Sequence, residues 1–184
     1  MDGSPKSITT DYRLATTEEA IAYIGDKKIF AFDLETVEPF HEKSFIPKLA
    51  RPLGYSVSIG EGSALYIPES PDNLRALLED ESVQVICHNA KFEAEVLREF
   101  CNIRLTNVQD TKLAAYVLGY RNTGLKAMSA QELGVIQMTI DEVKRGRPTE
   151  DITPEEWLPY GAADSDMTWR LHWLLQEELD TAES

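Results

Sequence analysis

The alternation of hydrophobic and polar residues along the chain predicts a sheet of several strands. Segment 27–36, KKIFAFDLET, is apolar on both faces until its acidic end, which is typical of a central strand. Two further apolar segments, 53–60 and 62–68, meet at the turn residues GEG and predict a β-hairpin. A buried strand is expected over 83–89 and a short edge strand over 107–110.

The remaining periodic segments predict helices. Thr16 and Glu19 have the spacing of a capping box and Gly25 is a helix stop, so a short helix is expected between them. Ser70 is expected to cap the second helix, and Pro159 to kink or restart the last one. The later helices are expected over segments 70–82, 90–102, 111–120, 124–135 and 153–179.

This order of elements predicts an α/β fold in which a central mixed sheet of five strands is flanked by helices. Residues 1–10 are polar and are expected to form a flexible tail, whereas residues 11–184 are expected to form a single domain. A chain of 184 residues is long enough to bury a sizeable core without disulfides or metal staples.

Composition favours an intracellular globular protein. Hydrophobic residues make up 42% of the chain, yet no apolar run approaches the roughly 20 residues that span a bilayer, so no membrane partner is expected. The first 13 residues contain no apolar core of a signal peptide. The two cysteines, Cys87 and Cys101, do not form a CxxC pair. These features predict a cytoplasmic, non-secreted protein.

The net charge of the chain bears on whether it can bind a nucleic acid. The chain has 32 acidic and 18 basic residues, which gives a formal charge of −14. Taken alone, this charge argues against a large nucleic-acid footprint, because phosphate binding normally needs a basic surface. The argument is reversed locally if the acids hold divalent cations, since a bound cation attracts phosphates to an acidic site.

Carboxylates lie at the ends of predicted elements. Asp33 and Glu35 end the first central strand two positions apart, so both side chains point to one face of the sheet. Glu93 follows a buried strand, and Asp164 lies on the last helix. Ligands gather at the carboxyl edge of open α/β sheets. Four carboxylates converging there would bind two hard cations, a clamp suited to in-line displacement at phosphorus.

Tyr160 precedes Asp164 by four residues, so the two share one face of the last helix. A tyrosine hydroxyl beside a cation-binding aspartate could orient an attacking water. The alternative is a half-buried tyrosine on an amphipathic helix, and the spacing alone does not separate the two.

Four segments occur in an order that resembles a known family. FDLET, HNAKFE, DTKLAAYVL and YGAADSDMTWRLH are similar to the motifs of DEDD-type 3′–5′ exonucleases, in the subclass whose third motif is Y-x-x-x-D. The residues between these segments, including LKAMSAQELG, are most similar to the proofreading domain of family A DNA polymerases, which resemble DNA polymerase I. The resemblance extends from about residue 10 to residue 180.

The resemblance implies a ribonuclease H-like fold and two divalent cations, Mg²⁺ or Mn²⁺. It implies hydrolysis from the 3′ end of single-stranded or frayed DNA, with release of nucleoside 5′-monophosphates. By position, Asp33 would bridge both cations, while Glu35 and Asp164 would bind the cation on the side of the attacking water. Tyr160 would help to position that water, and Glu93 would serve the second cation.

The resemblance also implies that Thr36, Asn89 and Phe92 contact the substrate strand. One catalytic position departs from the family, which has aspartate where this chain has Glu93. The extra methylene displaces the carboxylate by about 1.5 Å, one C–C bond. Positioning errors of this size can reduce a rate on the order of a hundredfold. We expect Glu93 to serve the second cation with weaker affinity.

Two other functions remain open at this point. One is a ribonuclease D-like exonuclease acting on RNA, and the other is a catalytically impaired nucleic-acid-binding domain. No polymerase module is recognisable in the chain, so a DNA polymerase module or another replication partner is a possible partner, in a bacterial or viral setting.

Overall fold

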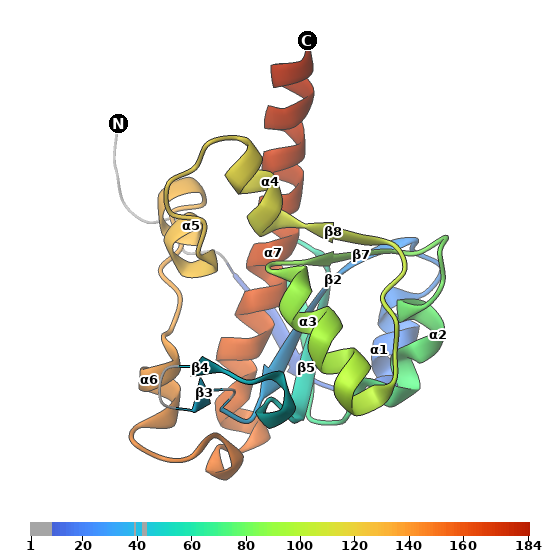
Figure 1. Cartoon of the computed structure of the whole chain (residues 1–184), viewed down its shortest axis with the longest axis vertical. Coiled ribbons are helices and arrows are strands. Elements are labelled where there is room, and N and C mark those ends of the chain that lie inside the picture. Colours follow the sequence, from blue (N-terminus) through green and yellow to red (C-terminus); the bar gives the residue numbers. More distant parts are fainter. Residues whose placement is uncertain (1–8, 39, 42–43) are drawn as a thin grey trace.

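The computed structural model describes residues 9–38, 40–41 and 44–184, and most of the expected tail at 1–10 lies outside this part of the chain. The fold is α/β with a mixed sheet flanked by helices, as the sequence predicts (Figure 1). The main sheet contains β1 (Asp11–Leu14), β2 (Ile29–Thr36), β5 (Pro52–Gly60), β6 (Ser63–Ile67), β7 (Gln84–Cys87) and β8 (Val108–Asp110). Two short strands, β3 (Phe40–His41) and β4 (Ser44–Phe45), pair separately.

The main sheet has the order β1-β6-β5-β2-β7-β8 in the described residues, and all five predicted strands are in it. Strand β2 pairs antiparallel with β5 and parallel with β7, so it lies in the middle of the sheet. The sixth strand, β1, adds to one edge by pairing in parallel with β6. Most of its side chains are exposed, so it lacks the apolar alternation that would have predicted a strand.

Seven α-helices are present in the described part: α1 (Thr17–Ile24), α2 (Arg75–Leu78), α3 (Ala90–Val96), α4 (Thr111–Val117), α5 (Leu125–Glu132), α6 (Ile140–Lys144) and α7 (Pro154–Glu183). The capping box of Thr16 and Glu19 begins α1 as predicted. Helix α6 was not predicted. No helix in the described ranges is long and apolar enough to cross a bilayer.

Two local predictions differ from the structure in part. Ser70 occupies the N-cap position before Pro71 as predicted, but its hydroxyl contacts the Asp72 carboxylate and does not cap a backbone N–H, and the segment begins as a 3₁₀ turn before α2. Helix α7 continues without a restart through Pro159. Pro159 is the sixth residue of α7, so the helix lacks the hydrogen bond that an N–H at this position would donate to the Glu155 carbonyl.

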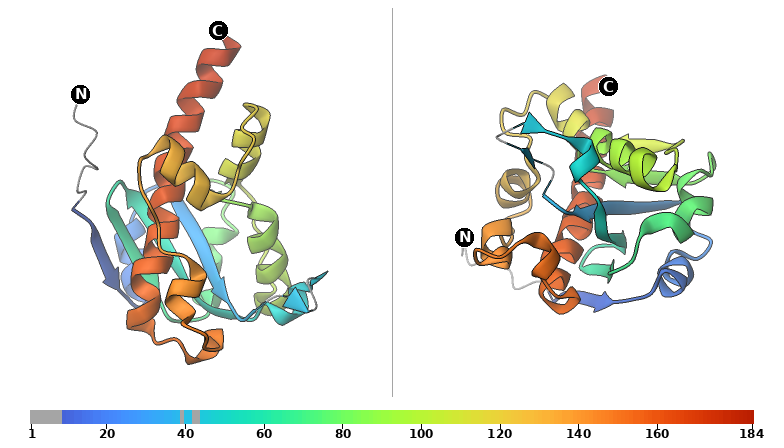
Figure 2. Two further views of the ribbon diagram at one scale, coloured as in Figure 1. Left: turned by 90° about the vertical axis from the view of Figure 1, so that its left-hand side faces the viewer. Right: turned by 60° about the horizontal axis from the view of Figure 1, so that its bottom comes forward.

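The alternation along β2 separates two layers. Phe30, Phe32 and Leu34 point into the main apolar core, which α1 and α3 cover. The intervening positions, including Asp33 and Glu35, point to the opposite face of the sheet. Helix α7 crosses this second face, with α3 on the far side of the sheet (Figure 2). The acidic residues of β2 therefore face α7.

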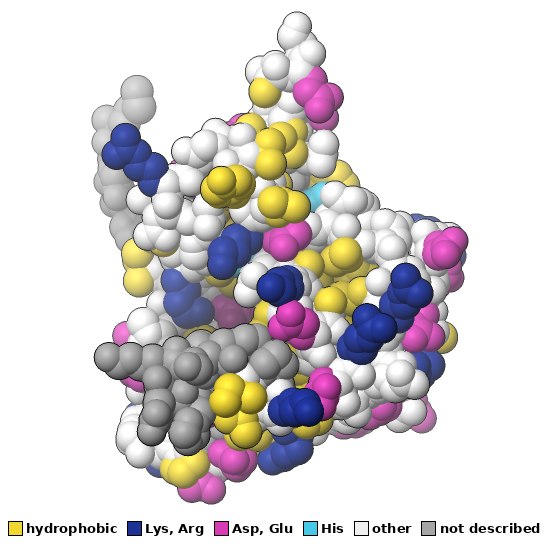
Figure 3. Space-filling model, in the orientation of Figure 1, with side chains coloured by type: hydrophobic (Ala, Val, Ile, Leu, Met, Phe, Trp, Pro, Cys, Tyr) yellow, Lys and Arg dark blue, Asp and Glu magenta, His cyan; other side chains and the backbone are white. Residues whose placement is uncertain are grey.

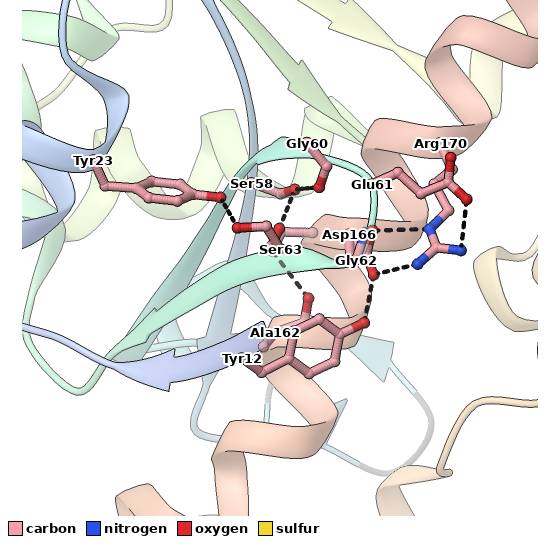
Figure 4. Close-up of polar contacts among 11 residues, drawn as sticks. Tyr12, Tyr23, Ser58, Gly60, Glu61, Gly62, Ser63, Ala162, Asp166 and Arg170 are labelled. Carbon is pink, nitrogen blue, oxygen red and sulfur yellow. Dashed lines mark hydrogen bonds and ion pairs between the residues drawn. The ribbon is translucent and has the colours of Figure 1, made fainter. Parts of the chain in front are cut away.

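A buried polar network fixes α7 against the sheet (Figure 4). The Asp166 carboxylate accepts hydrogen bonds from the Tyr12 hydroxyl at 2.5 Å and from the Gly62 backbone N–H at 3.0 Å. The Arg170 guanidinium donates to both oxygens of Asp166 at 2.9 Å, and it also lies 3.3 Å from Glu61. The network joins β1, the β5–β6 turn and α7, and so sets the position of the helix.

Substitution Arg170→Met is expected to lower the free energy of unfolding by about 3–5 kcal/mol, because the buried Asp166 carboxylate would lose its cation. Urea unfolding followed by circular dichroism measures the change. The double variant Arg170→Met/Asp166→Leu should recover part of the loss. A loss below about 1 kcal/mol for the single variant would show that the network contributes little.

Candidate active site

Three of the four predicted carboxylates come together. Asp33 and Glu35 extend from β2 and Asp164 from α7, and each offers an oxygen that lies within 4.8 Å of the other two. The period of the strand places the first pair on the face that α7 crosses. The sequence prediction that these acids share one location is therefore confirmed by geometry.

Two glycines allow close approaches near the site, Gly161 between α7 and the sheet and Gly54 between β5 and β6. A Cβ atom at Gly161 would lie 3.0 Å from the Tyr66 ring and 3.4 Å from Oε1 of Glu35. A Cβ at Gly54, which pairs with Glu35 across the β2–β5 ladder, would lie 2.7 Å from the carbonyl of Ile67. Larger residues at these positions would push the helix and the strands apart.

The grouping of acids is electrostatically unfavourable as it stands. Burial raises the pKa of Asp33, and the charge of Asp164 raises it further. Burial likewise raises the pKa of Glu35, followed by the charges of Asp33 and Asp164. A raised carboxyl pKa means that the charged form is destabilised at this location.

The residues fit a divalent cation. Oε1 of Glu35 is buried and has no hydrogen-bond partner among the described residues, and Glu35 belongs to the same group of three carboxylates. Carboxylate oxygens are the ligands that Mg²⁺, Mn²⁺ and Ca²⁺ prefer. A bound cation would coordinate the unpartnered oxygen of Glu35, and it would also offset the repulsion among the three carboxylates.

Asp164 has two polar partners that the sequence did not predict. Its Oδ1 accepts a hydrogen bond from Nε2 of Gln137 at 2.8 Å and lies 3.3 Å from Nζ of Lys126. Lys126 belongs to the segment LKAMSAQELG, so its position near the site could have been inferred from the resemblance. Gln137 lies between α5 and α6, and no sequence signal marks it.

Tyr160 lies one helical turn before Asp164, as predicted, and is half-buried. Its ring packs against Trp157, with a distance of 5.8 Å between ring centroids. Nζ of Lys126 lies 4.4 Å from the ring centroid, within the range of a cation–π contact. Burial raises the pKa of its hydroxyl, and the charges of Asp164, Glu35 and Asp33 raise it further. The tyrosine is therefore protonated at neutral pH.

Glu93 stands apart from the other three acids. It is 2% exposed, and it reaches the edge of the sheet from α3, on the layer opposite α7. Burial raises its pKa and Asp33 raises it further, which places the two carboxyl groups within electrostatic reach. Within the part of the chain that the structure describes, its Oε2 is buried without a hydrogen-bond partner. Glu93 does not, however, belong to the group whose oxygens lie within 4.8 Å.

The three predicted substrate residues lie at the end of β2 (Thr36) and in the first turn of α3 (Asn89 and Phe92). Thr36 follows an irregularity in the β2–β5 pairing and is half-buried. Asn89 has a left-handed backbone with φ of 80° at the start of α3, and Phe92 packs partly against the core. Their contacts with a substrate strand stay a prediction.

Asp110 aligns the segment that carries Glu93. Its carboxylate accepts hydrogen bonds from the backbone N–H groups of Asn89 and Ala90 at 3.0 and 2.9 Å. It also caps α4 through the N–H groups of Lys112 and Leu113. One side chain therefore serves the first turns of two helices, α3 and α4.

His88 has a structural position beside this segment. Its Nε2 donates a hydrogen bond to the Thr123 carbonyl at 2.7 Å, and its Nδ1 lies 2.8 Å from the Thr111 hydroxyl. Burial lowers the pKa of His88 to about 4. The ring is therefore neutral at pH 7 and connects the loop before α5 to the start of α4.

The charged surface around the site is mixed. Figure 3 shows lysine and arginine side chains interspersed with acidic ones on the face that it draws. Within the basic segment before α7, Arg147 pairs with Glu156 at 2.8 Å and Lys144 lies 3.3 Å from Glu38. These two cations are already paired within the protein, which limits their availability for phosphates.

A family model described as 3′–5′ exonuclease matches residues 8–180. The chain is also similar to DNA polymerase I of Treponema pallidum, with 31% identity over 137 residues. That match covers 70% of this chain and 13% of the polymerase. The chain thus spans only a small part of the length of this relative.

Solved structures share the fold. The Brucella melitensis protein NrnC with bound Mg²⁺ superposes with a TM-score of 0.74 at 23% identity, covering 95% of this chain and 84% of that one. Escherichia coli RNase D, described as an exoribonuclease involved in structured RNA processing, gives a TM-score of 0.70 at 20% identity. That match covers 95% of this chain and 46% of RNase D.

The low pKa of His88 leads to an expected pH dependence. Because the folded-state pKa is about 4 and the ordinary value is 6.5, the unfolded chain binds more protons between these pH values. The stability that neutral His88 contributes is therefore present above pH 6.5 and lost as the pH falls towards 4. We expect the difference in unfolding free energy between the wild type and His88→Gln to shrink by up to about 3 kcal/mol over this range. Chemical denaturation at several pH values measures it, and a constant difference would contradict a buried neutral ring.

Proposed function

The chain belongs to the 3′–5′ exonuclease family, and from that premise we propose that it removes nucleotides from single-stranded or frayed DNA with the help of two divalent cations, Mg²⁺ or Mn²⁺. The observation that carries the proposal is the group of three carboxylates with a buried, unpartnered oxygen on Glu35. The whole group lies within the part of the chain that the family model matches.

The reaction is hydrolysis of the terminal phosphodiester bond. A water oxygen attacks the phosphorus atom, the bond to the O3′ atom of the preceding nucleotide breaks, and a nucleoside 5′-monophosphate leaves. Bound divalent cations supply Lewis acidity at the attacking and leaving oxygens. Asp33, Glu35 and Asp164 would hold these cations, and their fixed positions on β2 and α7 place the carboxylates before substrate arrives.

Tyr160 would orient the attacking water. Its hydroxyl is protonated at neutral pH because burial and the nearby acids raise its pKa, so it can donate or accept a hydrogen bond without acting as a base. Its ring is fixed by contacts with Trp157 and Lys126. Such a fixed hydroxyl contributes to catalysis by positioning.

Glu93 would serve the second cation from the opposite layer of the fold. The support for this role is a buried oxygen that has no hydrogen-bond partner in the described ranges, together with the charge of Asp33, which raises the pKa of Glu93 after burial has raised it. Its separation from the other three acids agrees with weaker binding of the second cation.

DNA is the favoured substrate because a DNA polymerase I is the relative with 31% identity, whereas RNase D shares the fold at 20%. A ribonuclease D-like activity on RNA is the second candidate, supported by the RNA substrate in the description of RNase D and the TM-score of 0.70. In both cases Thr36, Asn89 and Phe92 would lie along the 3′ strand.

A protein partner would strengthen the binding of this chain to DNA. The chain carries a net charge of −14, so it has few free cations to displace the counterions of a nucleic acid. It also spans only 13% of the Treponema pallidum polymerase. We propose that a DNA polymerase module or a replication partner holds the substrate in the setting of proofreading.

Digestion of matched DNA and RNA oligonucleotides tests the function. Labels at the 3′ end and, separately, at the 5′ end report polarity, and reactions with Mg²⁺, Mn²⁺ or a chelator report cation dependence. We expect shortening from the 3′ end that a chelator abolishes, with faster digestion of DNA. Asp164→Asn is the matched control and should reduce the rate by at least about a hundredfold.

Other outcomes separate the alternatives. Faster digestion of RNA would replace DNA by RNA as the substrate. An absence of digestion by the folded wild type, with nucleic acid still bound, would indicate a catalytically impaired binding domain. Shortening from the 5′ end would overturn the proposed reaction.

Two substitutions test Glu93. Glu93→Ala is expected to reduce the rate on the order of a hundredfold at saturating Mg²⁺, because a cation ligand would be lost. Glu93→Asp restores the family residue and should retain or increase the wild-type rate. Full activity of Glu93→Ala in the same single-turnover assay would show that this carboxylate has no part in the reaction.

A further inference from the structure

Lys126 is the cation that contacts the acidic group in the described structure. It lies in the first turn of α5, and its Nζ is 3.3 Å from Oδ1 of Asp164. The Asp164 side chain is 9% exposed and that of Lys126 is 34% exposed, so the ion pair is partly shielded from water. Lys126 also lowers the pKa of Asp33 and Glu35, after burial and the neighbouring acids have raised it. Its charge therefore acts on all three carboxylates.

We propose that Lys126 is a built-in counter-ion of the carboxylate site, which offsets the repulsion between the acids and competes with divalent cations for Asp164. The inference rests on the proposed function, because it requires that these acids bind divalent cations. Lys126 is a positioning residue in this proposal, since it acts through Asp164 and Tyr160.

Lys126 makes two contacts at the same time. The ammonium pairs with Asp164, and it also lies 4.4 Å from the centroid of the Tyr160 ring. A cation that takes the place of the ammonium at Asp164 leaves the tyrosine contact available, because the ring lies one helical turn away. The side chain then stays beside the site and returns when the divalent cation leaves.

Gln137 contacts the same oxygen of Asp164 as Lys126 does, but it contributes a hydrogen bond without a charge. Its Nε2 donates to the same Oδ1 of Asp164 at 2.8 Å, but the amide is neutral. Removal of Gln137 would therefore take away a hydrogen bond and leave the charge balance of the site unchanged. Removal of Lys126 would take away a unit of positive charge.

The charge change has a predictable sign. Without Lys126 the site becomes more negative by one unit at a few ångströms from a bound divalent cation. Coulomb's law then gives an increase in cation affinity on the order of tenfold, even at the dielectric constant of water. The same change destabilises the cation-free protein, because the acids lose their counter-charge. A residue that only supported the local structure would weaken cation binding when removed.

The test is calorimetric titration of the metal-stripped protein with Mn²⁺ at low ionic strength. We expect Lys126→Met to bind Mn²⁺ about tenfold more tightly than the wild type and to unfold at a lower temperature without metal. Lys126→Arg retains the charge and should bind nearly as the wild type does. Gln137→Leu should show no comparable gain. Lys27→Met, which changes the net charge equally at an exposed position just before β2, should leave the affinity unchanged.

The outcomes distinguish the inference from the proposed function. If the wild type binds no Mn²⁺, the cation-dependent function is overturned. If the wild type binds Mn²⁺ and Lys126→Met binds equally or more weakly, the counter-ion proposal is overturned while the function stands. Should Lys126→Met fail to fold without metal, Lys126→Gln is titrated in its place and the same comparison of affinities decides.

Discussion

The repulsion between Asp33, Glu35 and Asp164 is the constraint around which the rest of the structure is arranged. Oxygens of the three carboxylates lie within 4.8 Å of one another. Burial raises the pKa of each group, and the charge of Asp164 raises the pKa of Asp33 and Glu35 further. A protein retains such a group only if the surrounding structure holds it together. The central position of β2 and the anchored helix α7 provide that support.

The support comes from residues that have no part in the reaction. Gly161 lets α7 approach β2 and the Tyr66 ring closely, and Asp166 ties the helix to the sheet by accepting hydrogen bonds from the Tyr12 hydroxyl and the Gly62 N–H. Asp164 and Asp166 are two positions apart on α7, so their side chains point in different directions around the helix. One aspartate is thereby fully paired by the fold, while the other is available to the site.

The two layers of the fold explain why the fourth acid differs. Glu93 extends from α3, which packs on the opposite face from α7, and it meets the other acids only across the end of β2. Its approach to Asp33 depends on how α3 begins, and Asp110 controls that start through hydrogen bonds to two backbone N–H groups. The position of Glu93 therefore depends on the start of α3, which the hydrogen bonds to Asp110 hold in place.

The sequence by itself determined the α/β class, five strands of the main sheet and the placement of Asp33, Glu35, Tyr160 and Asp164, because strand and helix periods fix which side chains share a face. It missed β1, whose few apolar residues gave no pattern. It placed Ser70 correctly at an N-cap position, but not the contact of its hydroxyl with the Asp72 carboxylate in place of a backbone N–H. Only the tertiary structure decided that Lys126 and Gln137 meet Asp164 and that Glu93 stands apart. These contacts join segments distant in sequence, and no local period encodes the distance between two packed layers.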